Sequence, residues 1–145
     1  MSVLIVSPKG KGNTYDLSRY IANNIDAELL VLERKEERDW KSYNSIFLCS
    51  GVYGGRVHKD LLEWLKRIEK TSISEDARFH MFLTWFGRGE SYKNAIEEVN
   101  IYLNENRFSL DGDCMTCYGG KGFIRRGHPD GEDCEKVLNW LKSKI

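Results

Sequence analysis

Residues 3–14, VLIVSPKGKGNT, are the part of the chain whose composition and spacing point most directly to chemistry. Four apolar residues predict a short buried strand, a loop with two glycines and two lysines follows, and Asn13 and Thr14 open an amphipathic helix. Such a turn gathers free backbone N–H groups and the positive end of the helix dipole, which together bind phosphate. The pattern is neither a Walker A loop nor the dinucleotide fingerprint GxGxxG. An ordinary polar turn is the alternative interpretation.

Three later loops also combine glycine with aromatic or hydroxyl side chains, and each follows an apolar run. Glycine at a strand end is usually a turn residue. Aromatic side chains gathered at one edge of a sheet, however, suit a flat and mostly apolar ring whose phosphate lies in the first loop. The three loops are GVYGGR (residues 51–56), WFGRGES (85–91) and YGGKGF (118–123).

Apolar runs alternate with helical stripes along the chain, which predicts an α/β fold with a parallel sheet and helices on both faces. Asp130 is a plausible N-cap for the last helix, whose apolar face would carry Cys134, Val137, Leu138, Leu141 and Ile145. The charged residues 33–39 are predicted to form a solvated loop. In such sheets the ligand binds at the carboxyl ends of the strands. Strands are predicted at residues 3–6, 28–32, 45–50 and 78–85, with a fifth within 108–118.

Composition favours one globular domain over residues 1–145, with 22 basic and 22 acidic residues and a net charge of zero. A neutral chain has no general attraction to nucleic acid or to an anionic membrane. No apolar run approaches the ~20 residues of a membrane span, and no basic segment precedes Val3, so we expect no signal peptide. The expectation is a cytoplasmic protein with its four cysteines reduced.

The ordered set of loops resembles that of the flavodoxin family over nearly the whole chain. The family's phosphate loop, a hydroxyl residue followed by a loop ending in Gly-Asn-Thr, corresponds to Ser7 through Thr14. Its Ser-Pro-Lys opening and greater length are more similar to the NAD(P)H-dependent FMN reductases. Residues 50–65 (SGVYGGRVHKDLLEWL) resemble the family's flavin loop and following helix, and also those of flavodoxin-like protoporphyrinogen oxidases. Residues 84–91 stand at the second flavin loop, and residues 126–141 resemble the end of short-chain flavodoxin-like proteins.

The resemblance implies a three-layer α/β/α domain with a five-stranded parallel sheet of order 2-1-3-4-5, and FMN bound without a covalent link at the switch point. Backbone and hydroxyl groups of the first loop would hold the phosphate, with added charge from a lysine. Tyr53 would stack on the isoalloxazine, with Trp85 or Phe86 beneath or beside it, and Gly54-Gly55 would be the flexible peptide facing the flavin N5. The implied cofactor-binding residues are Ser7, Lys9, Lys11, Gly12, Asn13, Thr14, Gly51, Val52, Tyr53, Gly54, Gly55, Thr84, Trp85, Phe86 and Gly87.

The chain departs from the flavodoxin pattern at two points. Arg88 stands where many flavodoxins have an aromatic residue, so Tyr53 alone would cover the outer face of the flavin. Electron-carrier flavodoxins are usually acidic, whereas this chain is neutral, and we expect its basic edge to raise the second-electron potential. That edge is either a solvated rim or a surface for an anionic partner. Its residues are Arg56, His58, Lys59, Arg88, Lys121, Arg125 and Arg126.

Other chemistries fit the sequence less well. Cys114, Cys117, His128 and Cys134 have some features of a zinc site, but Cys114 and Cys117 would face opposite sides of a strand and Cys134 fits a helix stripe. We therefore expect no metal site. We also expect no catalytic side chain, because the three histidines lack a clear acid–base partner and the nucleophile motif GxSxG is absent.

The sequence thus favours an FMN-binding electron-transfer protein that shuttles electrons between redox partner proteins. The alternative is an FMN-dependent oxidoreductase acting on a quinone, a porphyrinogen or NAD(P)H, with a small anionic or aromatic substrate near the flavin. A third possibility is a flavin-free domain that keeps the fold for protein contacts.

Overall fold

The computed structural model describes residues 2–36, 39–68, 72–85, 87, 89–120 and 127–145. Strands and helices alternate as the apolar periodicity predicts. The 3-10 turns η1 (Leu32–Arg34) and η2 (Trp40–Ser42) lie between β2 and β3. The main elements are β1 (Val3–Ser7), α1 (Asn13–Asn24), β2 (Ala27–Val31), β3 (Ser45–Gly51), α2 (Lys59–Arg67), β4 (Arg78–Trp85), α3 (Ser91–Glu105), β5 (Met115–Tyr118) and α4 (Gly131–Lys142).

The five strands form one parallel sheet in the order β2-β1-β3-β4-β5. This confirms the expected fold class and strand order. The register places Gly51 of β3 opposite Thr84 of β4, and Trp85 of β4 opposite Tyr118 of β5. The carboxyl ends of these strands, together with Ser7 at the end of β1, therefore meet at one edge of the sheet.

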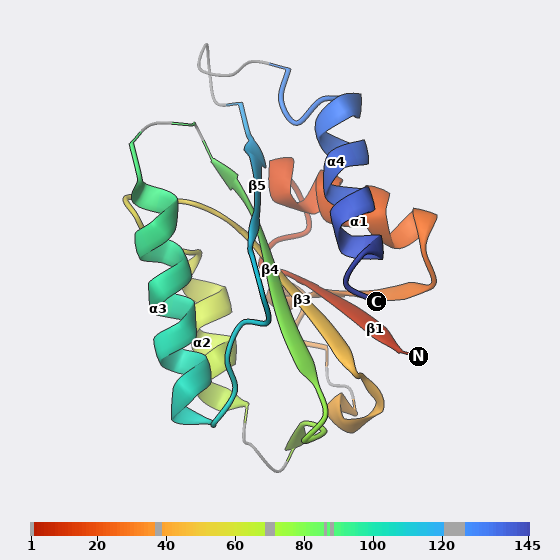
Figure 1. Cartoon of the computed structure of the whole chain (residues 1–145), viewed down its shortest axis with the longest axis vertical. Coiled ribbons are helices and arrows are strands. Elements are labelled where there is room, and N and C mark those ends of the chain that lie inside the picture. The colour runs from red at the N-terminus through yellow and green to blue at the C-terminus, as the bar shows by residue number, and fades with distance from the viewer. Residues whose placement is uncertain (1, 37–38, 69–71, 86, 88, 121–126) are drawn as a thin grey trace.

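Side chains alternate between two apolar cores, one on each face of the sheet. Leu4 and Val6 of β1 point to the core beneath α2 and α3, whereas Val3 and Ile5 point to the core beneath α1 and α4. Figure 1 shows α2 and α3 covering one face of the sheet and α1 and α4 covering the other. Because both faces of β1 are covered, its first four residues, 3–6, are all apolar.

The last helix begins where the sequence predicts. Asp130 caps α4 in a reciprocal arrangement, because its side chain accepts from the Asp133 N–H at 2.9 Å while the Asp133 side chain accepts from the Asp130 N–H at 2.9 Å. The predicted apolar face is wrong at its end. Ile145 lies beyond the last helical residue, Lys142, and is 41% exposed.

No helix in the described part of the chain is both long enough and apolar enough to cross a membrane.

Candidate functional site

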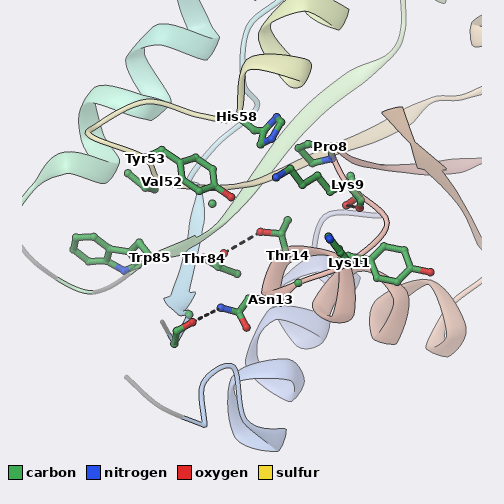
Figure 2. Close-up of a pocket in the computed structure, with 16 residues that line it drawn as sticks. Pro8, Lys9, Lys11, Asn13, Thr14, Val52, Tyr53, His58, Thr84 and Trp85 are labelled. Atoms are coloured by element: carbon green, nitrogen blue, oxygen red, sulfur yellow. Dashed lines mark hydrogen bonds between the residues drawn. The ribbon is translucent and has the colours of Figure 1, made fainter. Parts of the chain in front are cut away.

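A cavity of about 250 Å³ opens at the carboxyl ends of β1, β3 and β4 (Figure 2). It lies at the switch point of the sheet, where the chain turns from β1 toward β2 on one side and β3 flanks β1 on the other. This volume is just below the roughly 300–1,000 Å³ typical of small-molecule sites, so a large ligand would stay partly exposed. Its sixteen lining residues are Ser7, Pro8, Lys9, Lys11, Gly12, Asn13, Thr14, Tyr15, Gly51, Val52, Tyr53, His58, Thr84, Trp85, Gly119 and Gly120.

The N-terminus of α1 opens directly into this cavity. Gly12 is the N-cap residue, with φ 97° and ψ −175°, and no side chain caps the helix. The N–H groups of Asn13, Thr14 and Tyr15 precede the first helical hydrogen bond, in which the Asp16 N–H donates to the Gly12 carbonyl at 2.9 Å. These three residues line the cavity. The N-terminus of α1 therefore presents backbone donors and the positive end of its dipole to a bound anion.

Three polar side chains predicted to contact phosphate form hydrogen bonds within the protein. The Ser7 hydroxyl donates to the carbonyl of the residue two positions later at 2.9 Å. The Asn13 Nδ2 donates to the Gly120 carbonyl at 2.8 Å, and the hydroxyls of Thr14 and Thr84 lie 3.0 Å apart (Figure 2). These bonds tie the first loop and α1 to the ends of β4 and β5. The side chains shape the cavity, and the backbone supplies the donors that face a ligand.

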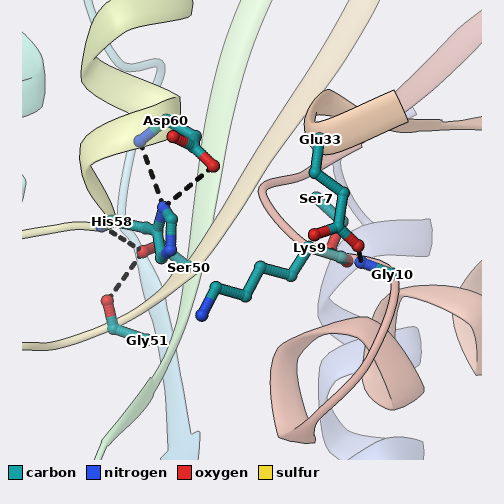
Figure 3. Close-up of polar contacts among 8 residues, drawn as sticks. All are labelled: Ser7, Lys9, Gly10, Glu33, Ser50, Gly51, His58 and Asp60. Atoms are coloured by element: carbon teal, nitrogen blue, oxygen red, sulfur yellow. Dashed lines mark hydrogen bonds and ion pairs between the residues drawn. The ribbon is translucent and has the colours of Figure 1, made fainter. Parts of the chain in front are cut away.

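Glu33, in η1, holds the first loop from the side opposite α1. Its Oε1 accepts from the Gly10 N–H at 2.6 Å (Figure 3), and its own N–H donates to the Pro8 carbonyl at 3.1 Å. Glu33 is exposed, as expected for a residue of the charged segment 33–39, and in addition it anchors the first loop. Because the two bonded positions lie 23 residues apart, no local spacing in the sequence could have indicated the contact.

Val52, Tyr53 and Trp85 supply apolar walls, and two of these side chains are flat aromatic rings. Tyr53 is 57% exposed, and its ring lies over Gly51, where a Cβ atom would meet the Tyr53 hydroxyl at 2.7 Å. This close approach explains the glycine at the end of β3. Partial burial raises the pKa of Tyr53, so its hydroxyl remains protonated at neutral pH. The Trp85 ring packs edge-on against Tyr92 of α3, with ring centroids 4.7 Å apart.

His58, the N-cap of α2, also lines the cavity and was predicted only as part of a basic edge. Its backbone N–H donates to the Ser50 Oγ at 2.9 Å, and its Nδ1 accepts from the Asp60 N–H at 3.1 Å (Figure 3). Burial is the largest cause that lowers the pKa of His58. The neutral ring therefore carries its proton on Nε2.

The structure brings most of the predicted cofactor-binding residues together around the cavity, but not all of them. Gly54, Gly55 and Gly87 are not among the lining residues, and Phe86 lies outside the described residues. The cavity adds five residues that were not predicted as cofactor-binding, namely Pro8, Tyr15, His58, Gly119 and Gly120. Gly119 and Gly120 directly follow β5. Their position after a predicted strand could have indicated that they belong to the site.

Gly54 and Gly55 form the turn of a small hairpin. The Tyr53 N–H donates to the Arg56 carbonyl at 2.7 Å, and the Arg56 N–H donates back to the Tyr53 carbonyl at 3.0 Å. Both glycines have positive φ, 57° and 80°, as a type I′ turn requires. The turn aims Tyr53 at the cavity, and the glycines themselves stand outside its lining.

The basic edge is described only in part. Arg56 is paired with Glu98 of α3, with the Arg56 Nη2 2.9 Å from the Glu98 Oε2. Four further basic residues, Arg88, Lys121, Arg125 and Arg126, lie outside the described residues. The histidines were expected to lack a clear acid–base partner, and two of them have a carboxylate beside Nδ1. The His58 Nδ1 lies 3.7 Å from an Asp60 carboxylate oxygen, and the His128 Nδ1 lies 2.5 Å from that of Asp133.

The cysteines lie as strand and helix periodicity predicts. Cys114 packs against the core beneath α2 and α3, whereas Cys117 belongs to the core on the opposite face of the sheet. Among the described residues, the group with metal-ligand spacing is instead His128, Asp130 and Asp133. The side chains of Asp130 and Asp133 already accept hydrogen bonds in the cap of α4, and Asp133 also pairs with His128. Helix capping therefore accounts for this cluster.

Comparisons with known proteins agree with the architecture. The structure of a flavodoxin from the domain Archaea superposes with a TM-score of 0.72 at 14% identity, covering 96% of this chain and 92% of that one. The chain has the flavodoxin fold. Oxidised flavodoxin 1 of Bacillus cereus gives a TM-score of 0.70 at 18% identity, covering 97% of this chain and 94% of that one. An uncharacterized protein of Methanocaldococcus jannaschii is 24% identical in an alignment 142 residues long that covers 90% of this chain and 89% of that protein. No protein-family profile matches the sequence.

The flavodoxin fold by itself leaves the ligand open, because one fold supports many functions. The chemistry of the cavity narrows the choice. Its α1 end offers backbone N–H groups together with Lys11, its walls include Tyr53 and Trp85, and none of its sixteen described lining residues is Asp or Glu. A ligand that joins a phosphate to a flat ring fits this donor set, and FMN has both parts.

Proposed function

We propose that the protein binds FMN in this cavity and works as an electron-transfer flavoprotein. The observation that carries the proposal is the uncapped N-terminus of α1, which opens into a cavity with aromatic walls. In this proposal the N–H groups of Asn13, Thr14 and Tyr15 bind the phosphate, while Lys11 adds charge. The isoalloxazine lies among Val52, Tyr53 and Trp85, and Thr84 stays bonded to Thr14 and keeps α1 in place.

When bound, the flavin supplies the redox chemistry, since it takes up and releases one or two electrons. The chain supplies binding, orientation and electrostatics. The loop that carries Lys9 and Lys11 is held by the Glu33 carboxylate at the Gly10 N–H, so its backbone is already ordered around the cavity. A site ordered before binding loses less conformational entropy when the ligand arrives.

The test compares FMN with riboflavin, which has the same ring and lacks the phosphate. Quenching of flavin fluorescence during titration of the apoprotein measures both dissociation constants. We expect FMN to bind at least about tenfold more tightly, equivalent to about 1.4 kcal/mol from the phosphate contacts. Equal affinities for the two flavins, or binding of neither, would refute the proposed phosphate site.

Variants at Asn13 separate the backbone donor from the side chain. Proline is tolerated at the first position of a helix, so Asn13→Pro removes one N–H from the proposed phosphate site without breaking α1. Asn13→Ala is the matched control, because it loses the same bond to the Gly120 carbonyl but keeps the N–H. We expect Asn13→Pro to lose most of the preference for FMN over riboflavin and Asn13→Ala to keep it.

An FMN-dependent oxidoreductase is the second candidate, favoured by Lys9 and His58 in the cavity wall. Anaerobic reductive titration distinguishes the two. A carrier that exchanges electrons with redox partner proteins is expected to be reduced in two resolved one-electron steps and to react slowly with NAD(P)H. Rapid direct bleaching by NADH or NADPH would favour the oxidoreductase.

A further inference from the structure

The cavity is lined by basic side chains, and two of them have no part in the proposed phosphate site. Lys9, Lys11 and His58 line it, while no Asp or Glu is among its sixteen described lining residues. The chain as a whole is neutral, with 22 basic and 22 acidic residues. The gathering of basic side chains is therefore local to the cavity. Lys11 stands beside α1. His58 enters from α2, which covers the opposite face of the sheet (Figures 1 and 2).

His58 is held in one orientation from two sides. Its backbone N–H donates to the Ser50 Oγ at 2.9 Å, and the Ser50 hydroxyl donates to the Gly51 carbonyl at 2.7 Å. Its Nδ1 accepts from the Asp60 N–H at 3.1 Å, and its side chain is only 11% exposed. The Nε2–H is thus the donor that remains. Among the described residues we find no acceptor for it.

Lys9 approaches the same place from the first loop. The Ser7 hydroxyl donates to the Lys9 carbonyl at 2.9 Å, which fixes the start of its side chain. The side chain then extends toward His58 (Figure 3), and Tyr53 points into the same part of the cavity (Figure 2). No carboxylate in the described ranges forms an ion pair with the Lys9 ammonium. An ammonium and an imidazole N–H that converge in this way match the two oxygens of an oxyanion.

We propose that Lys9 and His58 form a second oxyanion subsite, which binds one carboxylate or phosphate group of a small organic anion. The inference rests on the proposed function, because it assigns the N-terminus of α1 to the phosphate of FMN. The second subsite then receives the substrate, beside the Tyr53 ring, whose centroid lies 5.8 Å from that of His58. The inference uses only the FMN-binding part of the proposed function. Binding of a substrate at this subsite would favour the second candidate, the oxidoreductase, with organic anions as its substrate class.

Binding at this subsite depends on pH through His58. Burial, Lys9 and Lys59 lower its pKa, while Asp60 and Glu33 raise it. An anion at Nε2 adds a negative charge, so it raises the pKa of His58, and by linkage the anion binds more tightly as the pH falls. The charged and titratable groups that face His58 are Lys59 and Asp60 of α2, Lys9 of the first loop, Glu33 of η1 and Tyr53 of the hairpin.

The test is an NMR pH titration of the histidine side chains in FMN-loaded protein, with sodium benzoate as the carboxylate probe and sodium chloride at equal ionic strength as the control. We expect saturating benzoate to raise the pKa of His58 by about one unit, which corresponds to about tenfold tighter binding by the protonated form. His80 and His128 serve as internal references that do not shift. Inorganic phosphate is the second probe.

Three variants complete the design. Lys9→Gln should abolish the benzoate-induced shift, whereas Lys59→Gln, an exposed lysine outside the cavity lining, should retain it. His58→Asn keeps a good N-cap for α2 and should weaken benzoate binding about tenfold at pH 5.5, a loss that falls away as the pH rises.

The outcomes separate this inference from the proposed function. FMN binding without any benzoate effect on His58 would overturn the second subsite and leave the cofactor proposal standing. A shift of His58 caused by FMN but not by riboflavin, with no further effect of benzoate, would also overturn it, because the cofactor's own phosphate would then occupy Lys9 and His58. A benzoate effect in apoprotein that binds no FMN would support the subsite and refute the proposed function.

Discussion

Single residues at the carboxyl edge of the sheet divide into those that local sequence reveals and those that it does not. Tyr53 and Trp85 could be predicted because each stands at or just beyond the end of a predicted strand, where a parallel sheet places its ligand. Glu33 could not, because its bond to Gly10 joins two segments that meet only after β1 and β2 pair. His58 also could not be predicted, because it lies seven residues beyond β3. The hairpin that pairs Tyr53 with Arg56 reverses the chain and brings His58 back to the cavity.

His80 is a buried histidine outside the cavity, and it makes stability depend on pH. It is 1% exposed and stacks on Phe47, with ring centroids 4.7 Å apart. Burial lowers its pKa below the ordinary 6.5, so the unfolded state binds more protons and the free energy of unfolding decreases as the pH falls below about 6.5. His80→Phe should raise the free energy of unfolding by about 1 kcal/mol at neutral pH and reduce this acid sensitivity.

Urea unfolding followed by circular dichroism between pH 5 and 8 measures both effects. His58→Asn is the control, since it leaves His80 intact and should retain the part of the acid sensitivity that His80 causes. An unchanged pH slope in His80→Phe would show that His80 is not a source of the effect.

Helices and strands could be predicted where the apolar pattern is long and ends at a clear turn or capping residue. The predicted strand 78–85 coincides with β4, and Asp130 caps α4 as expected. β5 is shorter than its predicted window, because the chain before it makes only an isolated bridge between Leu110 and Phe79 and turns at Gly112 with φ 74°. A turn of this kind interrupts a strand, but the apolar pattern of the sequence does not reveal it.

The cap of α4 gives a prediction at this scale. Asp130→Ala removes the side chain that accepts from the Asp133 N–H, and an N-cap of this kind contributes about 1 kcal/mol to the free energy of unfolding. Chemical denaturation should show that loss. Glu132→Ala is the matched control, because Glu132 is an exposed acidic residue in the same first turn and should change stability much less. Equal losses in both variants would indicate a general charge effect at the helix dipole.

At the scale of the whole molecule, the strand order and the net charge were predicted from different kinds of information. Alternating strands and helices predict the α/β class, but the order β2-β1-β3-β4-β5 came from the resemblance to flavodoxins, because several orders satisfy the same alternation. The charge balance is read directly from composition. Composition does not predict where on the molecule the charged side chains gather, and the structure shows two lysines and no carboxylate among the described residues that line the cavity.

This charge distribution predicts the redox behaviour of bound FMN. Fully reduced flavin carries negative charge, so nearby cations favour it, and the second-electron potential should be higher than in strongly acidic flavodoxins. Lys9→Glu should lower that potential by about 59 mV, the equivalent of a tenfold change for one electron. Lys59→Glu makes the same charge change outside the cavity lining and should have a smaller effect. Spectroelectrochemical titration checks both, and a wild-type potential as low as in acidic flavodoxins would contradict the expectation.

An amide chemical-shift map of the apoprotein titrated with FMN tests most directly whether the phosphate lies at the N-terminus of α1. We predict saturable changes that are largest at the N–H groups of Gly12, Asn13, Thr14 and Tyr15, with a second group at Val52, Tyr53 and Trp85. Changes that fail to saturate, or that concentrate on the outer faces of α2 and α3 and leave the first loop unaffected, would contradict an FMN site at the end of β1.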